Sequence, residues 1–327
     1  MPYVELHCHS AYSFLDGASQ PEELVAAAVN RGHSALALTD HDSLSGSMEF
    51  AQAATALGLR AIHGAEVTLD DGRHITLLVR DATGWRSLCH LLTRAHADTR
   101  EGPQRNRSEP SVSLQDVEAQ HAGLVCLSGC ARNGIRDEPT MRRLLRAFGH
   151  DAFRVELQRP LARHDRALNR GLASLAARLG VPTVATGNVH AHTRERAYLQ
   201  DAFVAIREHT TRDASEPLRR GNHAHVLTSP QAMEARFADH PDAVAESQRL
   251  AETLTFDLTS DLGYRYPGAE DATAGRTLAE VCQARFAERY PRGSPHHEEA
   301  RARLEEELRV IDDLGLSGFF LLHRDLL

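Results

Sequence analysis

Short apolar runs alternate with longer amphipathic stretches along the first part of the chain. The apolar runs are typical of buried strands, and they occupy residues 35–38, 60–62, 66–69, 74–79, 123–127, 153–157 and 181–185. Between them, apolar residues recur at helical spacing and predict helices over 19–32, up to Gly58, over 85–96 and up to Gly180. The first of these helices opens with a capping-box pattern at Ser19 and Glu22. This order of strand and helix indicates an α/β fold.

The pattern changes after Ser229, where helical periodicity replaces the strand-like runs. It predicts helices near 229–239, 241–253, 276–290 and 297–314. The stretch 261–268 contains glycine and proline, interrupts this series and has the composition of a domain boundary. We therefore expect two domains, at 1–265 and 266–327.

The composition excludes several classes of protein. Hydrophobic residues make up 42% and charged residues 25% of the chain, which is ordinary for a globular protein. The five cysteines form no Cys-x-x-Cys pair, which favours reduced thiols and a cytoplasmic location. No apolar run approaches the roughly eighteen residues of a membrane span, and no secretory signal pattern opens the sequence. We expect no membrane partner.

The charge balance limits how the chain could bind nucleic acid. All 37 basic residues are arginine, yet the formal net charge is −8. A domain that grips duplex DNA by itself is more often basic, with its cationic residues gathered on one face. If nucleic acid is the substrate, most of the electrostatic attraction is expected to come from elsewhere.

Imidazoles and carboxylates are concentrated just outside the first predicted strands. His7 and His9 form a His-x-His pair, Asp16 follows, and His41 and Glu66 lie next to apolar stretches. In an extended segment, residues i and i+2 project to the same side, so both rings of the pair can reach one ion. Imidazoles bind zinc, manganese or iron, and carboxylates supply the negative charge that lets several cations lie close together. The cluster predicts a multi-metal hydrolytic site.

Later candidates also lie where a predicted strand ends. Cys130 follows one such strand, and Asn188 and His190 follow another. Active sites of α/β barrels and open parallel sheets are assembled from loops at the carboxyl ends of strands. The candidates are therefore expected to meet at one edge of the sheet.

Other residues of the same types have plainer interpretations. Cys126 lies inside an apolar run and is expected in the core. His223 and His225 repeat the His-x-His spacing but are expected to be exposed to solvent. Asp40 and Asp42 flank a histidine and are expected to orient its imidazole rather than bind an ion.

Four motifs occur in order: Tyr3-Val-Glu-Leu-His7-Cys-His9-Ser10, Ser13-Phe-Leu-Asp16-Gly17, Ala37-Leu-Thr39-Asp40-His41-Asp42 and Gly64-Ala-Glu66. Together they resemble the PHP (polymerase and histidinol phosphatase) domain at the N-terminus of bacterial C-family DNA polymerases. The chain is most similar to the error-prone, damage-inducible branch of the DNA polymerase III alpha subunits.

The resemblance implies a distorted seven-stranded (βα) barrel of PHP type, followed by a mainly helical segment that begins the polymerase palm and thumb region. It implies up to three divalent metal ions, zinc, manganese or iron, held by nine positions. The first ion would be bound by His7, His9, Glu66 and Asn188, the second by Glu66, His96 and Cys130, and the third by Asp16, His41 and His190.

One position departs from the family pattern. Asn188 stands where the family has an aspartate near the final histidine. A neutral amide offers a carbonyl oxygen without a negative charge. Two interpretations stay open: a metal centre that hydrolyses phosphoesters, and a metal site that only stabilises the fold.

An active centre would hydrolyse a phosphodiester or phosphomonoester, as the 3′-to-5′ exonuclease of replicative relatives does. We hypothesise that Asn188 weakens such editing here. For the intact enzyme the resemblance implies DNA replication, repair and translesion synthesis after DNA damage, on a DNA primer-template and with the sliding clamp and other translesion proteins as further partners. The alternatives are a free-standing histidinol-phosphatase-like phosphoesterase and a structural module that supports a polymerase body.

The family's polymerase catalytic residues are missing from this sequence. The chain reaches a palm-like lead-in at 305–321, whereas the glycine-rich nucleotide loop and paired catalytic aspartates lie further downstream in the family. We therefore interpret the chain as a fragment or truncated product and expect no template-directed nucleotide incorporation.

Overall fold

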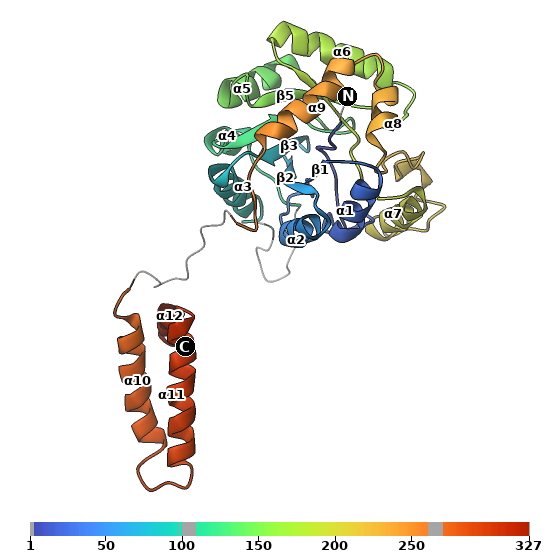
Figure 1. Ribbon diagram of the computed structural model, residues 1–327. Coiled ribbons are helices and arrows are strands. Elements are labelled where there is room, and N and C mark those ends of the chain that lie inside the picture. Colours follow the sequence, from blue (N-terminus) through green and yellow to red (C-terminus); the bar gives the residue numbers. More distant parts are fainter. Residues whose placement is uncertain (1–2, 98, 100–108, 261–270, 327) are drawn as a thin grey trace. The chain divides into compact units, whose positions relative to one another are not determined.

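The computed structural model describes residues 3–97, 99, 109–260 and 271–326. The chain divides into two compact units, 1–262 and 263–327. The first contains a curled sheet surrounded by helices and the second contains helices (Figure 1). The predicted boundary stretch 261–268 lies outside the described residues. The α/β class that the sequence predicts is confirmed for the first unit.

The sheet has six strands that follow one another in chain order. They are β1 (Ala35–Leu38), β2 (Arg60–Thr68), β3 (His74–Val79), β4 (Leu124–Leu127), β5 (Phe153–Gln158) and β6 (Thr183–Thr186). Neighbouring strands are parallel except that β3 runs antiparallel to both β2 and β4. The first residue of β3 therefore lies at the same edge of the sheet as the last residues of its neighbours.

Two of the predicted strands, 60–62 and 66–69, are one continuous strand. Gly64 makes this possible, because a Cβ atom there would lie 2.4 Å from the carbonyl oxygen of Leu77 on β3. The glycine lets the backbones of β2 and β3 approach closely enough to keep their pairing.

The N-terminal segment closes one side of the curled sheet. Glu5 is bridged to Leu36 of β1, and Cys8 is bridged to Val189, just beyond β6. The His9 amide donates to the Val189 carbonyl at 2.7 Å, and the Val189 amide donates to the His7 carbonyl at 2.9 Å. These bonds fix the His-x-His pair between the two ends of the sheet.

Nine α-helices are described in the first unit, and they lie around the outside of the sheet (Figure 1). They are α1 (Pro21–Asn30), α2 (Ser47–Leu57), α3 (Ala82–Ala95), α4 (Leu114–Ala119), α5 (Glu138–Phe148), α6 (Asp165–Leu179), α7 (Arg194–Arg207), α8 (Pro230–Arg236) and α9 (Pro241–Thr253). The capping box of α1 is formed by Gln20 and Glu23, one residue later than predicted. None of the helices in the described part of the chain is long and apolar enough to cross a membrane.

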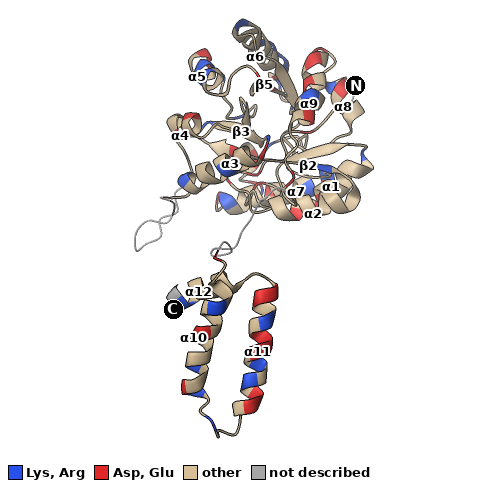
Figure 2. Ribbon diagram, turned by 60° about the vertical axis from the view of Figure 1, so that its left-hand side comes forward, with Lys and Arg blue, Asp and Glu red and all other residues tan. Residues whose placement is uncertain are grey.

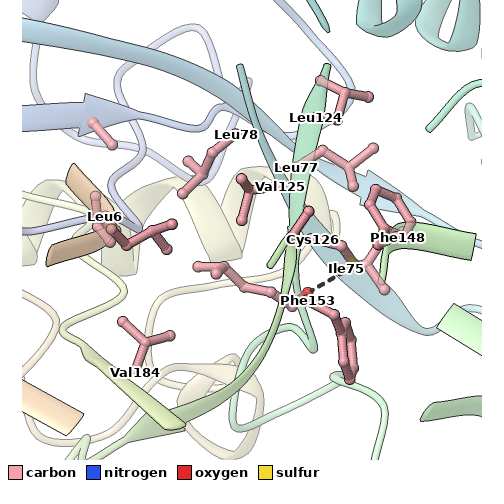
Figure 3. Packing of buried hydrophobic residues seen from close by; sticks show 14 of the residues in the cluster. Leu6, Ile75, Leu77, Leu78, Leu124, Val125, Cys126, Phe148, Phe153 and Val184 are labelled. Carbon is pink, nitrogen blue, oxygen red and sulfur yellow. Dashed lines mark hydrogen bonds between the residues drawn. The ribbon is translucent and has the colours of Figure 1, made fainter. Parts of the chain in front are cut away.

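The main core lies between the strands and their covering helices. Leu77, Val125 and Phe153 come from three neighbouring strands and pack together there (Figure 3). Cys126 belongs to the same cluster and is fully buried, as predicted. This apolar packing holds the strand ends that carry the polar residues described below.

His63 on β2 lies in an aromatic environment. Its ring makes edge contacts with Phe50, Trp85 and Phe256 at centroid distances of 6.0, 5.9 and 6.0 Å. Neither ring nitrogen has a hydrogen-bond partner. Burial lowers the pKa of His63 from 6.5 to about 4.

We expect the free energy of unfolding to depend on pH through His63. The unfolded chain protonates this residue below about pH 6.5 while the folded chain does not, so stability falls as the pH drops from 7.5 to 5, by about 2 kcal/mol from this residue. His63→Phe should remove that part of the pH dependence. Denaturant titration followed by Trp85 fluorescence at both pH values measures it, and equal pH dependence in variant and wild type would contradict the prediction.

The second unit contains α10 (Ala274–Arg289), α11 (His297–Asp313) and α12 (Ser317–Leu326). Acidic and basic positions alternate along α11 (Figure 2). Arg301 pairs with Glu305 and Arg303 with Glu307, at 3.1 and 2.9 Å. Such exposed pairs stabilise a helix by only about 0.3–0.5 kcal/mol each. The assignment of this unit to a polymerase palm and thumb stays a prediction.

Candidate metal centre

Most of the predicted ligands meet at one edge of the curled sheet. His7 and His9 come from the closing N-terminal segment, His41 follows β1, Glu66 lies on β2, and His190 follows β6. Three compact groups of ligand atoms form there, each with its atoms within 4.8 Å of one another: His9, His41 and His190; His7, His9 and Glu66; and His41, Glu66 and His74.

Glu66 stands at the centre of these groups. Its Oε2 atom lies 3.5 Å from His7 Nε2, 3.3 Å from His9 Nε2 and 3.3 Å from His41 Nδ1, and its Oε1 atom lies 3.3 Å from His74 Nδ1. The side chain is 1% exposed. Burial opposes ionisation, but the neighbouring His41 and His7 outweigh it and hold the pKa of the Glu66 carboxyl well below its usual range.

Several buried polar atoms of this edge have no hydrogen-bond partner. They include Asn188 Oδ1 and Glu156 Oε2, while Glu66 Oε1 and His74 Nδ1 form no hydrogen bond and have only each other at 3.3 Å. Buried polar atoms are nearly always paired in folded proteins, and these are oxygen and imidazole nitrogen atoms, the types that bind divalent cations. The residues present therefore fit a group of divalent ions.

His7 is held by a second buried carboxylate. Glu156 on β5 accepts a hydrogen bond from His7 Nδ1 at 2.7 Å and another from Gln158 Nε2 at 2.7 Å. Burial would lower the pKa of His7, but Glu156 and Glu66 raise it to about 10. With Nδ1 bound to Glu156, the Nε2 atom of His7 faces His9 at 3.1 Å and Glu66. A carboxylate of this kind fixes the tautomer and orientation of a ligand histidine.

A second corner of the centre is formed by Asp16, His41 and His190. The Oδ2 atom of Asp16 lies 3.1 Å from His41 Nε2 and 2.9 Å from His190 Nε2. Arg220 donates to both oxygens of Asp16. Burial opposes ionisation of Asp16, but His190 and Arg220 hold the pKa of its carboxyl well below the usual range.

His96, Cys130 and Asn188 lie on the wall of the same cavity but in none of the three compact groups. His96 Nε2 donates to the Asp42 carbonyl at 2.8 Å, and Cys130 Sγ accepts from the Asn133 amide at 3.4 Å. Burial raises the pKa of the Cys130 thiol. Asn188 has a φ of 50°, a left-handed conformation that asparagine tolerates well.

The cavity at this edge has a volume of about 630 Å³ and is lined by more than ligands. Phe14, which is 79% exposed, and Tyr12 lie on its wall together with Arg132, Arg207 and Arg220. The arrangement offers a metal site, aromatic rings and cationic donors to one bound molecule. Anionic phosphate groups suit the arginines, and planar rings suit the aromatic side chains.

Three residues of the centre were missed by the sequence reasoning. His74 begins β3, and only the antiparallel direction of that strand brings it to this edge. Glu156 lies within an ordinary strand sequence, and Arg220 lies in an irregular segment. His74 alone gave a signal, as a histidine directly before an apolar run.

Two expectations about neighbouring residues were wrong. His223 and His225 are partly buried and hydrogen-bonded rather than solvent-exposed, because the segment that carries them folds back over the loop after β6. His223 Nε2 lies 3.1 Å from Asp201 Oδ2, and His225 Nδ1 donates to the Asn188 carbonyl at 3.0 Å.

The carboxylates that flank His41 do not bond its ring. Asp40 accepts from Ser10 and Ser13, and Asp42 accepts from Thr68. Asp40 therefore acts on the centre through the Ser13 hydroxyl, which lies 3.2 Å from His9 Nδ1. Neither carboxylate belongs to a compact group of ligand atoms, and the expectation that they orient the His41 imidazole stays a prediction.

Comparison with known proteins shows what this chain is similar to. A family model for the PHP domain matches residues 5–160. The chain is 34% identical over 98% of its length to an error-prone DNA polymerase of Symbiobacterium thermophilum, and 35% identical over 100% of its length to one of Mycolicibacterium paratuberculosis. It spans 31% of the length of each of these relatives. Among solved structures, an amidohydrolase from Chromobacterium violaceum is 22% identical with a TM-score of 0.43, over 57% of this chain and 87% of that chain.

Proposed function

This chain belongs to the PHP-domain proteins related to bacterial error-prone DNA polymerases, and on that premise we propose that its metal centre hydrolyses a phosphoester bond. One observation supports the proposal most strongly. A single buried carboxylate, Glu66, faces four imidazoles within 3.5 Å, while Asn188 Oδ1 and Glu156 Oε2 at the same edge have no hydrogen-bond partner.

The ligands proposed for two ions are taken from the positions named by the resemblance, with His74 added. His7, His9, Glu66 and Asn188 would hold one ion, and His41, Glu66 and His74 lie where a second would bind. His96 and Cys130 border the cavity beside the second position. Bound divalent ions would supply a water of lowered pKa and would stabilise negative charge on the phosphoryl oxygens.

The protein's own groups have separate tasks in this proposal. Glu156 holds His7 so that its Nε2 atom faces the centre. Arg132 and Arg207 on the cavity wall would attract and orient an anionic substrate. Phe14 would cover the substrate from the solvent side, because its ring is exposed on that wall.

We propose that the activity belongs to a longer polymerase. The chain would be its N-terminal part, with the N-terminal segment counted as the seventh strand of a distorted barrel and residues 266–327 as the start of the palm and thumb. The primer-template would then be the physiological substrate, as part of damage-induced DNA synthesis. The relatives' name and the similarity over nearly all of this chain support this assignment.

We expect hydrolysis of a DNA 3′ end or of an aryl phosphate only in the presence of a divalent ion, and its complete loss on chelation. His9→Ala should lower the rate at least about 100-fold, because it removes an imidazole shared by two of the compact groups. His150→Ala, at an exposed ring outside the centre, is the matched control. Elemental analysis of both variants and of the wild type accompanies the assay.

Metal bound by the wild type without hydrolysis of either substrate would refute the catalytic proposal and favour a structural metal site. In that case chelation should still lower the melting temperature. Preference for histidinol phosphate over DNA would favour the free-standing phosphatase instead.

A further inference from the structure

Arg220 lies inside the metal centre although no pattern in the sequence pointed to it. It follows the short 3₁₀ helix Glu216–Leu218, and its side chain is 14% exposed. Its Nη2 atom lies 3.1 Å from Asp16 Oδ1, 2.8 Å from Asp16 Oδ2 and 2.6 Å from His190 Nε2. The guanidinium thus contacts two of the three residues that the resemblance assigns to a third ion.

The two ring nitrogens of His190 have different partners. Nδ1 lies 2.9 Å from the carbonyl oxygen of Asn188, so it donates to that oxygen. Nε2 lies 2.9 Å from Asp16 Oδ2 and 2.6 Å from Arg220 Nη2. The buried Asp16 carboxylate needs a positive charge at this position, which a metal ion, a guanidinium or a protonated imidazole can supply.

The cation that the chain places there is Arg220. A guanidinium stays charged at every pH at which the protein is folded, and its planar donors can bind both oxygens of a carboxylate. Arg207 lies further off, with its Nη1 atom 3.9 Å from Asp16 Oδ1. Of these two arginines, Arg220 is therefore the one in hydrogen-bond contact with Asp16.

We propose that Arg220 takes the place of a third metal ion, so that the centre holds two ions and one guanidinium. This inference rests on the proposed function and adds to it the number of ions that the centre binds. Arg220 also lines the neighbouring cavity of about 510 Å³, and its buried Nε atom has no partner. The same side chain can therefore donate to a substrate oxygen at the border of the two cavities while it remains bound to Asp16.

The count of bound ions tests the inference. At saturating Mn²⁺, measured by elemental analysis after removal of free metal, the wild type should hold two ions per chain. Arg220→Met should hold three, because Asp16 and His190 then face an open position. Arg219→Met is the matched control, since Arg219 binds Asp201 and not Asp16, and it should hold two.

Three ions in the wild type, or an unchanged count in Arg220→Met, would overturn the inference while leaving the proposed function intact. No ion in the wild type would refute both this inference and the proposed function. Asp16→Asn covers the case of an Arg220 variant that does not fold. If Arg220 replaces the third ion, this change leaves two ions bound, whereas the loss of one ion would overturn the inference.

Discussion

Glu66→Gln is expected to empty the metal centre and to lower hydrolysis at least about 100-fold. The two carboxylate oxygens face His7, His9, His41 and His74 within 3.5 Å. An amide of the same size removes the negative charge on which closely spaced cations depend, and it directs an NH₂ group toward imidazole lone pairs. No other carboxylate belongs to the compact groups of the described residues, so none can take over this role.

Isothermal titration with Mn²⁺ and Zn²⁺ measures the loss, together with circular dichroism to confirm folding. Glu246→Gln is the matched control, because Glu246 is also a buried carboxylate but pairs with Arg154 and Arg249 on the outside of the sheet. The control should lose stability and keep its metal. Full metal occupancy in Glu66→Gln would disprove the arrangement proposed for the centre.

The sequence predicted the strand ends well because each strand is a separate, local apolar run. β1, β3 and β4 begin and end within a residue of their predicted limits. His41 follows β1 and His190 follows β6, so a rule about the carboxyl ends of strands was enough to expect that they would meet. Helices α4, α5, α7 and α12 were not predicted. One of them, α7, carries Arg207, which lines the cavity, so the sequence pattern missed a part of the site's wall.

The missed residues depend on strand direction and long-range folding, which no local pattern contains. His74 reaches the centre only because β3 is antiparallel to its neighbours. Glu156 meets His7 across 149 positions, and Arg220 meets Asp16 across 204. Carboxylate and guanidinium side chains at such positions have ordinary neighbours in sequence, so their function becomes visible only when the chain is folded.

Asn188 stands where the family has an aspartate, and its surroundings indicate what restoring the carboxylate would do. Its Oδ1 atom is buried without a partner, while its Nδ2 atom donates to Gln158 Oε1 at 3.4 Å. The left-handed backbone at φ 50° is one that aspartate also tolerates. A carboxylate could therefore replace the amide without a change of backbone.

Asn188→Asp is expected to tighten metal binding by about 10–100-fold and to increase metal-dependent trimming of a mismatched primer end. Without metal, the same change should destabilise the fold by about 1–3 kcal/mol, because it buries a further negative charge on the wall of a cavity that Glu66 also lines. Thermal unfolding with and without Mn²⁺, together with the trimming assay, measures both effects.

Asn188→Asp should tighten metal binding and lower the stability of the metal-free protein. A second variant tests whether residue 188 binds the ion or only adds negative charge to the cavity. Asn133→Asp adds the same charge to the cavity wall at a partly exposed position, and it should change metal affinity much less. If Asn188 lies outside the ion's reach, both variants will behave alike. Full trimming by the wild type, with no gain in Asn188→Asp, would show that the amide does not weaken editing and that the charge on Glu66 and Glu156 is sufficient for the centre.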